Sequence, residues 1–182
     1  MTIVESFPSP IKQWYAHLPI FCFDVSYCRL DSEQHLPPKR HEILAKEIAA
    51  RSKQLAVVGG FMFFQSPDRV GTADFFLIAM DPPSPGNHRN MVVCAYKCKN
   101  YDSANVPSVN DEVDKAAHTV DAIKNQPVFS NCNIFAHFVL VYDFPLKCDS
   151  RIMKGMEMVQ LSRDAACRKT SKFDNLFVFG SK

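Results

Sequence analysis

The chain has 182 residues, a formal net charge of +2, 47% hydrophobic residues and 22% charged residues. This composition excludes a disordered tail and a strongly basic nucleic-acid-coating protein. The length suffices for one domain with a substantial core. No window approaches about 18 continuous apolar residues, so we expect no membrane span.

The cysteines and the N-terminal residues both bear on the cellular compartment. Seven cysteines are spread along the chain without a dense framework. The first residues lack a basic segment followed by an apolar run, which is the pattern of a secretory signal. We therefore expect an intracellular protein, cytoplasmic or nuclear, with reduced thiols. Cys94 and Cys98 would lie about 13 Å apart along one strand, so we expect buried apolar side chains and not a zinc pair.

The N-terminal part of the chain predicts a strand, a helix and a second strand. Residues 18–28 are apolar enough for a strand. Residues 39–54 show apolar side chains at spacings of three and four, which predicts a helix. Residues 57–68 carry strand-forming side chains on both sides of Gly59-Gly60. This pattern predicts a strand with a bulge or a close backbone approach at the glycines.

The stretch from Asp74 to Lys99 predicts two neighbouring strands joined by a proline-rich loop. Side chains alternate between the faces of a strand, so Asp74 shares a face with Ile78. In the second strand Lys97 and Lys99 share one face, and Tyr96 points to the other, where we expect it in the core. The hairpin therefore predicts a carboxylate and a lysine in the same region of a sheet.

The remaining sequence predicts a second helix and further strands. A helix is expected over about residues 110–125. Residues 133–144 form a continuous apolar run, typical of a strand buried on both faces, and His137 inside it is expected to be a hydrogen-bonded core histidine. Residues 150–170 fit either a helix or a strand. Residues 175–180 predict a short last strand.

No repeat or linker divides the chain, so we expect a single domain over residues 1–182. Its parts would be an arm with a first strand over 1–38, a core over 39–143 and a C-terminal extension over 144–182. The core order is helix, three strands, helix, strand. This order predicts an α/β fold, with a mixed α+β sheet flanked by helices, antiparallel hairpins and one parallel crossover.

This order, with Asp74 opening one strand and Lys97 closing the next, resembles the PD-(D/E)xK restriction-endonuclease-like superfamily over roughly residues 39–143. The resemblance implies a restriction-endonuclease-like α-β-β-β-α-β core. In that family two acids bind Mg²⁺ or Mn²⁺, and a lysine orients or activates the attacking water. A hard divalent ion takes oxygen ligands and lowers the pKa of its bound water. The resemblance therefore implies hydrolysis of phosphodiester bonds in DNA or RNA.

The second acid of the family pattern is missing, because Ala95 stands two residues before Lys97. Some members place this acid on the following helix, where this chain has Glu112. An acid at a helix N-terminus is also favoured by the helix dipole alone. Asp68 in Pro67-Asp68 is an alternative first acid, or part of an ordinary turn. The resemblance thus implies metal ligands among Asp74, Glu112 and Asp68, and catalytic residues among Lys97 and Lys99.

Two further features bear on a site. The viral cap-snatching endonucleases of this superfamily place a histidine where His41 stands, and a solvated surface histidine is the alternative. A basic stretch near the C-terminus either tracks a phosphate backbone or forms a solvated face. This stretch consists of Arg163, Arg168, Lys169 and Lys172.

Three functions remain open at this point. The first is a metal-dependent nuclease acting on DNA or RNA. The second is a catalytically inactive domain of the same fold that binds a protein or nucleic-acid partner, and Ala95 favours this alternative. The third is an unrelated α/β domain with an interaction role. The sequence leaves the oligomeric state open.

Overall fold

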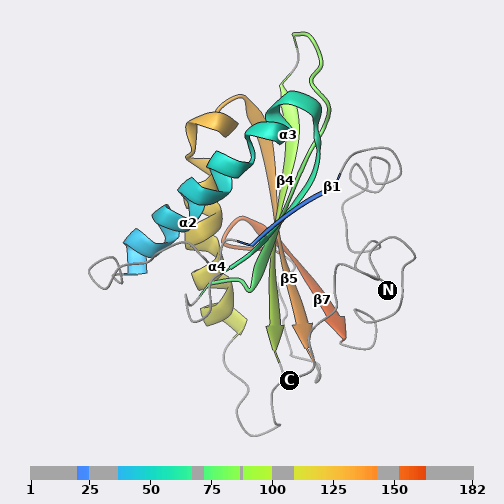
Figure 1. Cartoon of the computed structure of the whole chain (residues 1–182). Coiled ribbons are helices and arrows are strands. Elements are labelled where there is room, and N and C mark those ends of the chain that lie inside the picture. The colour runs from blue at the N-terminus through green and yellow to red at the C-terminus, as the bar shows by residue number, and fades with distance from the viewer. Residues whose placement is uncertain are drawn as a thin grey trace, which may run out of the picture.

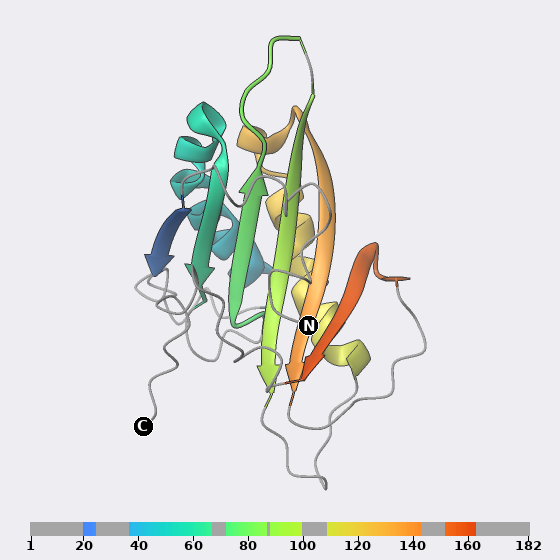
Figure 2. The ribbon, with the colours of Figure 1, turned by 90° about the vertical axis from the view of Figure 1, so that its right-hand side faces the viewer.

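The computed structural model describes residues 20–24, 37–66, 72–86, 88–99, 109–142 and 152–162. A mixed sheet of seven strands forms its centre, in the order β1-β2-β3-β4-β5-β7-β6 (Figure 2). The strands are β1 (Ile20–Asp24), β2 (Gly60–Gln65), β3 (Phe75–Met80), β4 (Arg89–Lys99), β5 (Cys132–Tyr142), β6 (Ile152–Met153) and β7 (Met156–Ser162). The helices are α2 (Pro37–Arg51), α3 (Lys53–Val58), α4 (Val109–Lys124) and the short 3₁₀ helix η3 (Pro127–Phe129). None of these helices is long and apolar enough to cross a membrane.

The strand pairing confirms the mixed α+β sheet that the sequence predicts. Strands β2, β3 and β4 form an antiparallel meander, and β4 pairs with β5 in parallel through the α4 crossover. Two further parallel pairs, β1 with β2 and β5 with β7, were not predicted. The β7 strand resolves the ambiguity over residues 150–170 in favour of a strand at 156–162. The strand predicted at 175–180 lies outside the described residues.

Both long helices lie on one face of the sheet (Figure 1). Strands β1 and β4 run the same way, and both crossovers move in the same direction across the sheet. Right-handed connections of this kind place α2 and α4 on the same side. In the described part of the chain the sheet is therefore covered by helices on one face, and not flanked by them on both.

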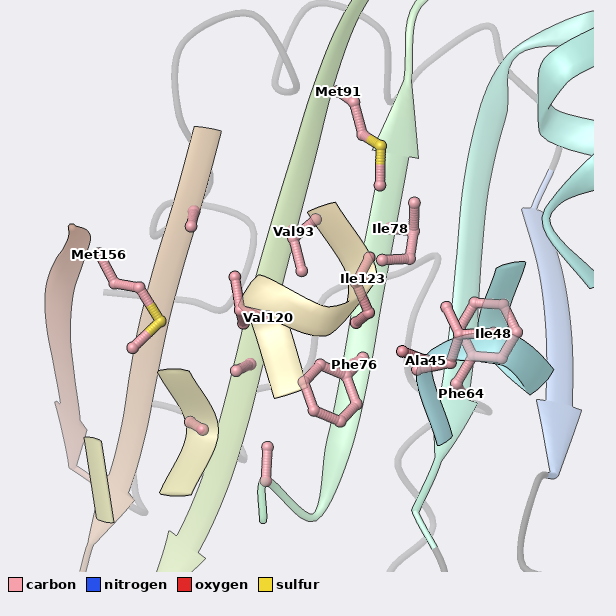
Figure 3. Close-up of a cluster of buried hydrophobic side chains, with 14 of the residues drawn as sticks. Ala45, Ile48, Phe64, Phe76, Ile78, Met91, Val93, Val120, Ile123 and Met156 are labelled. Carbon is pink, nitrogen blue, oxygen red and sulfur yellow. The ribbon is translucent and has the colours of Figure 1, made fainter. Parts of the chain in front are cut away.

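The main core fills the space between α2, α4 and this face of the sheet (Figure 3). Alternation along β3 and β4 sends Phe76, Ile78 and Val93 into this core, on the face of the sheet that also carries Asp74 and Lys97. From the helices, Ile48 and Val120 point toward them (Figure 3). Burial of these apolar side chains supplies the main stabilisation of the fold.

A second apolar cluster lies on the opposite face of the sheet, and it includes Tyr96, as expected. Cys94 is buried there and Cys98 is partly buried, and both are free thiols. His137 is also buried, but its Nδ1 only approaches the carboxylate of Glu157, at 3.2 Å, without hydrogen-bond geometry. The predicted burial of His137 is confirmed, whereas its predicted hydrogen bond is not found in the described part of the chain.

The helix predicted over 39–54 divides at Ser52 into α2 and α3. The buried Ser52 hydroxyl donates to the Ile48 carbonyl at 2.8 Å, a bond that bends helices. Helix α3 then continues through Val58, so the strand predicted over 57–68 starts only at Gly60. The predicted close approach at the glycines is confirmed, because a Cβ on Gly59 would lie 2.8 Å from the Pro82 nitrogen.

Candidate functional site

The predicted pairing of Asp74 with Lys97 is present at the rim of the sheet. The Asp74 N–H donates to the Tyr96 carbonyl at 2.8 Å, which extends the β3–β4 pairing by one residue. Lys97 Nζ lies 2.7 Å from Asp74 Oδ1, and the Cys98 N–H donates to Asp74 Oδ2 at 2.6 Å. Both oxygens of the carboxylate therefore already have a close partner.

The lysine of this pair is more buried than the acid. The Lys97 side chain is 14% exposed and that of Asp74 is 40% exposed. Lys97 Nζ also donates to the Thr72 carbonyl at 2.8 Å. Two oxygen acceptors, one from the backbone and one from a side chain, thus hold the ammonium.

A buried chain of polar side chains continues from Thr72 to α2. Thr72 Oγ1 lies 2.7 Å from Thr119 Oγ1 on α4, and Thr119 Oγ1 lies 2.5 Å from His41 Nδ1 on α2. All three residues are buried, and Thr119 is completely inaccessible. Buried polar groups need such partners, because an unpaired one costs free energy. These hydrogen-bonded side chains therefore connect α2 and α4 to the segment around Thr72, whose carbonyl accepts from Lys97.

His41 is 7% exposed, so the interpretation of this residue as a solvated surface histidine is wrong. Its ring centroid lies 5.6 Å from that of His118. Burial lowers the pKa of His41, and the neighbouring His118 and Arg40 lower it further. The neutral imidazole is therefore favoured within the network.

Glu112 is a buried carboxylate on α4, with 6% exposure and its Oε1 3.2 Å from Lys115 Nζ. The spacing from Glu112 to Ala116 and to Thr119 places the three on one face of the helix. Seven residues of helical rise put Glu112 about 10 Å from Thr119 along the axis, toward the start of α4. Glu112 therefore lies on the same helix face as Thr119, the residue that contacts Thr72.

The fit of this arrangement to a divalent metal ion is poor. Within the described ranges, no three or more side chains of His, Cys, Asp or Glu are grouped so that they could hold a metal ion. Ala95, at the position of the family's second acid, is completely buried in the core. An ion at Asp74 would compete with the Lys97 ammonium and with the Cys98 N–H for the carboxylate oxygens.

The other predicted site residues are Lys99, Asp68 and the basic stretch near the C-terminus. Lys99 is the last residue of β4, and its side chain is not described. Outside the described residues lie Asp68, Arg163, Arg168, Lys169 and Lys172.

Sequence reasoning missed Thr72 and Thr119. Thr119 had a signal, because it occupies a position on the buried stripe of α4 where the pattern requires an apolar side chain. A hydroxyl at such a position needs a buried partner. Thr72 had no comparable signal, because it lies in the loop before β3 and its partner is distant in sequence.

Comparison of the chain with protein-family models, with curated proteins and with solved structures found no match.

Proposed function

We propose that this chain is a nucleic-acid-associated domain on a nuclease-like core, in which Asp74 and Lys97 hold the hairpin and do not bind a metal ion. The order of α2, β2, β3, β4, α4 and β5 supports the nuclease-like core. The observation that carries the structural role of the pair is the engagement of both Asp74 oxygens, by Lys97 and by the Cys98 N–H. The buried Ala95 supports it further, because it supplies no second acid.

A second candidate is divalent-metal-dependent hydrolysis of phosphodiester bonds. It is favoured by Glu112, a buried carboxylate on the face of α4 that contacts Thr72. In this candidate Asp74 and Glu112 would be the ligands of Mg²⁺ or Mn²⁺, and Lys97 or Lys99 would be the catalytic lysine. In it the ion would compete with the Lys97 ammonium for Asp74 Oδ1.

A titration with Mn²⁺ separates the two candidates. Thermal unfolding and calorimetry are measured for the wild type and for Asp74→Ala and Glu112→Ala, with single- and double-stranded DNA and RNA as substrates. Asp121→Ala, an exposed acid elsewhere on α4, is the matched control. We expect no Mn²⁺-dependent rise in melting temperature, intact substrates, and nucleic-acid binding that weakens as salt rises.

A rise in melting temperature that disappears in both site variants, together with cleavage, would replace the first proposal by the second. Absence of both binding and cleavage for all four nucleic acids would remove both proposals.

A further inference from the structure

The loop between β3 and β4 is a proline-rich tip at one end of the sheet. Residues 82–86 read Pro-Pro-Ser-Pro-Gly, and all five are exposed. The loop projects beyond the helices at the top of Figures 1 and 2. Exposed proline rings on a protruding loop present apolar surface that the fold itself does not use.

The covalent geometry of this tip favours an extended polyproline II conformation. The rings of Pro82, Pro83 and Pro85 restrict φ to about −65°. A residue that precedes proline is also restricted to the extended region, which applies to Pro82 and Ser84. No helix forms here, and a turn starts only at Pro85. In a polyproline II segment, with three residues per turn, Pro82 and Pro85 would lie on the same edge, about 9 Å apart.

The base of the tip is held rigidly. The Asp81 carboxylate accepts hydrogen bonds from the Asn90 N–H at 3.0 Å and from its side-chain amide at 3.1 Å. The Arg89 guanidinium donates to the Asp81 carbonyl and, at 2.7 and 2.9 Å, to the carbonyls of Ala56 and Leu55 at the end of α3. These bonds join the two ends of the loop to α3. A preorganised segment loses less conformational entropy on binding.

Two valines extend the apolar surface beside this base. Val57 is 70% exposed and Val58 is 47% exposed, and Phe135 is the only other large hydrophobic residue exposed in the described part of the chain. Gly59 follows them directly and packs against the backbone of Pro82. The valines therefore adjoin the prolines in space. We use the name proline tip for residues 82–86 together with Val57 and Val58.

We propose that the proline tip docks a protein domain that binds polyproline II segments in a groove lined by aromatic rings. The Pro-x-x-Pro spacing from Pro82 to Pro85 fits such grooves, which receive the prolines of one edge between aromatic side chains. Residues 82–86 carry no charge, and Arg89 is occupied by three carbonyl oxygens. The recognition is therefore apolar and does not depend on an acidic pocket of the partner. This proposal is independent of the nucleic-acid-associated function.

The test uses the full chain, labelled with ¹⁵N, and a panel of purified SH3 and WW domains at submillimolar concentration. We expect at least one domain to shift signals of residues 57–59 and 81–89. The double variant Pro82→Ala/Pro85→Ala should bind at least tenfold more weakly, equivalent to about 1.4 kcal/mol, because both anchoring rings are lost. Val57→Ser/Val58→Ser should weaken binding by a smaller factor.

Pro127→Ala, an exposed proline in η3, is the matched control and should bind as the wild type does. Thermal unfolding confirms that each variant is folded, since the replaced side chains are exposed. The proposal is overturned if no domain of the panel binds, if the double proline variant binds with wild-type affinity, or if the shifted signals map away from the proline tip.

Discussion

Replacing Thr119 by valine is a direct test of the buried network beneath the Asp74–Lys97 pair. The substitution nearly preserves volume and removes the hydroxyl that contacts His41 Nδ1 at 2.5 Å and Thr72 Oγ1 at 2.7 Å. All three residues are buried, so water does not replace the lost contacts. Each buried polar group left without a partner costs about 1–3 kcal/mol, and two such groups give about 2–6 kcal/mol.

Urea unfolding followed by far-UV circular dichroism measures this loss. For a chain of this length each kcal/mol moves the melting temperature by about 2–4 °C, so a loss of about 3 kcal/mol lowers it by about 6–12 °C. The dependence on urea should keep its slope, because the surface exposed on unfolding is unchanged. Thr119→Ser is the matched control: it keeps the hydroxyl, loses one methyl group, and should cost about 1 kcal/mol.

The reasoning is refuted if Thr119→Val is no less stable than Thr119→Ser. A second check is the double variant Thr72→Val/Thr119→Val. Removing both hydroxyls leaves fewer unpaired groups than the two single changes together, so its loss should be smaller than their sum. Strict additivity would show that the two hydroxyls do not act as a pair.

Three further predictions concern Gly59, the hairpin pair and the buried histidines. Gly59→Ala should lower the free energy of unfolding by about 1–3 kcal/mol in urea, because φ is +72° and a Cβ would meet the Pro82 backbone at 2.8 Å. Gly86→Ala, also at positive φ but in open space, should cost less, and equal losses would contradict the packing argument. Asp74→Ala should lower the melting temperature more than Lys97→Met does. It leaves a mostly buried ammonium and a backbone N–H without their carboxylate, whereas the carboxylate left by Lys97→Met is part-exposed. The reverse order in thermal unfolding would contradict this account. Burial lowers the pKa of His41 and of His137, although Glu157 partly opposes this at His137. The unfolded state therefore binds more protons just below the ordinary histidine pKa of 6.5, so unfolding free energy, measured in urea, should fall from about pH 7.5 to about pH 5. His41→Gln and His137→Gln should each flatten that decline, and an unchanged profile in both would show that other groups cause it.

Local patterns in the sequence were sufficient for the elements whose signal is periodic. The alternation along β3 and β4 predicted that Tyr96 is buried on the face opposite to Lys97, and it predicted that Asp74 and Lys97 meet. The apolar stripe predicted α4, and the continuous apolar run predicted β5. These predictions succeeded because side-chain direction in a helix or strand follows from backbone geometry alone.

Local patterns gave wrong predictions of secondary structure or burial where contacts with residues distant in sequence determine them. The β-branched Val57 and Val58 favour a strand, yet they are helical, and Arg89 from β4 binds the carbonyls of Leu55 and Ala56 just before them. His41 looked like a surface residue in a first helical turn, and only the packing of α2 on α4 buries it against Thr119.

Local patterns in the chain were enough to predict the helix and strand order of residues 39–143 and the acid–lysine pair on one hairpin. The tertiary structure alone decided which polar groups are paired: both oxygens of Asp74 with Lys97 and the Cys98 N–H, and Thr72 with Thr119 and His41. A buried polar group is satisfied by whichever partner the fold brings within about 3 Å, and here that partner is encoded far away in the chain.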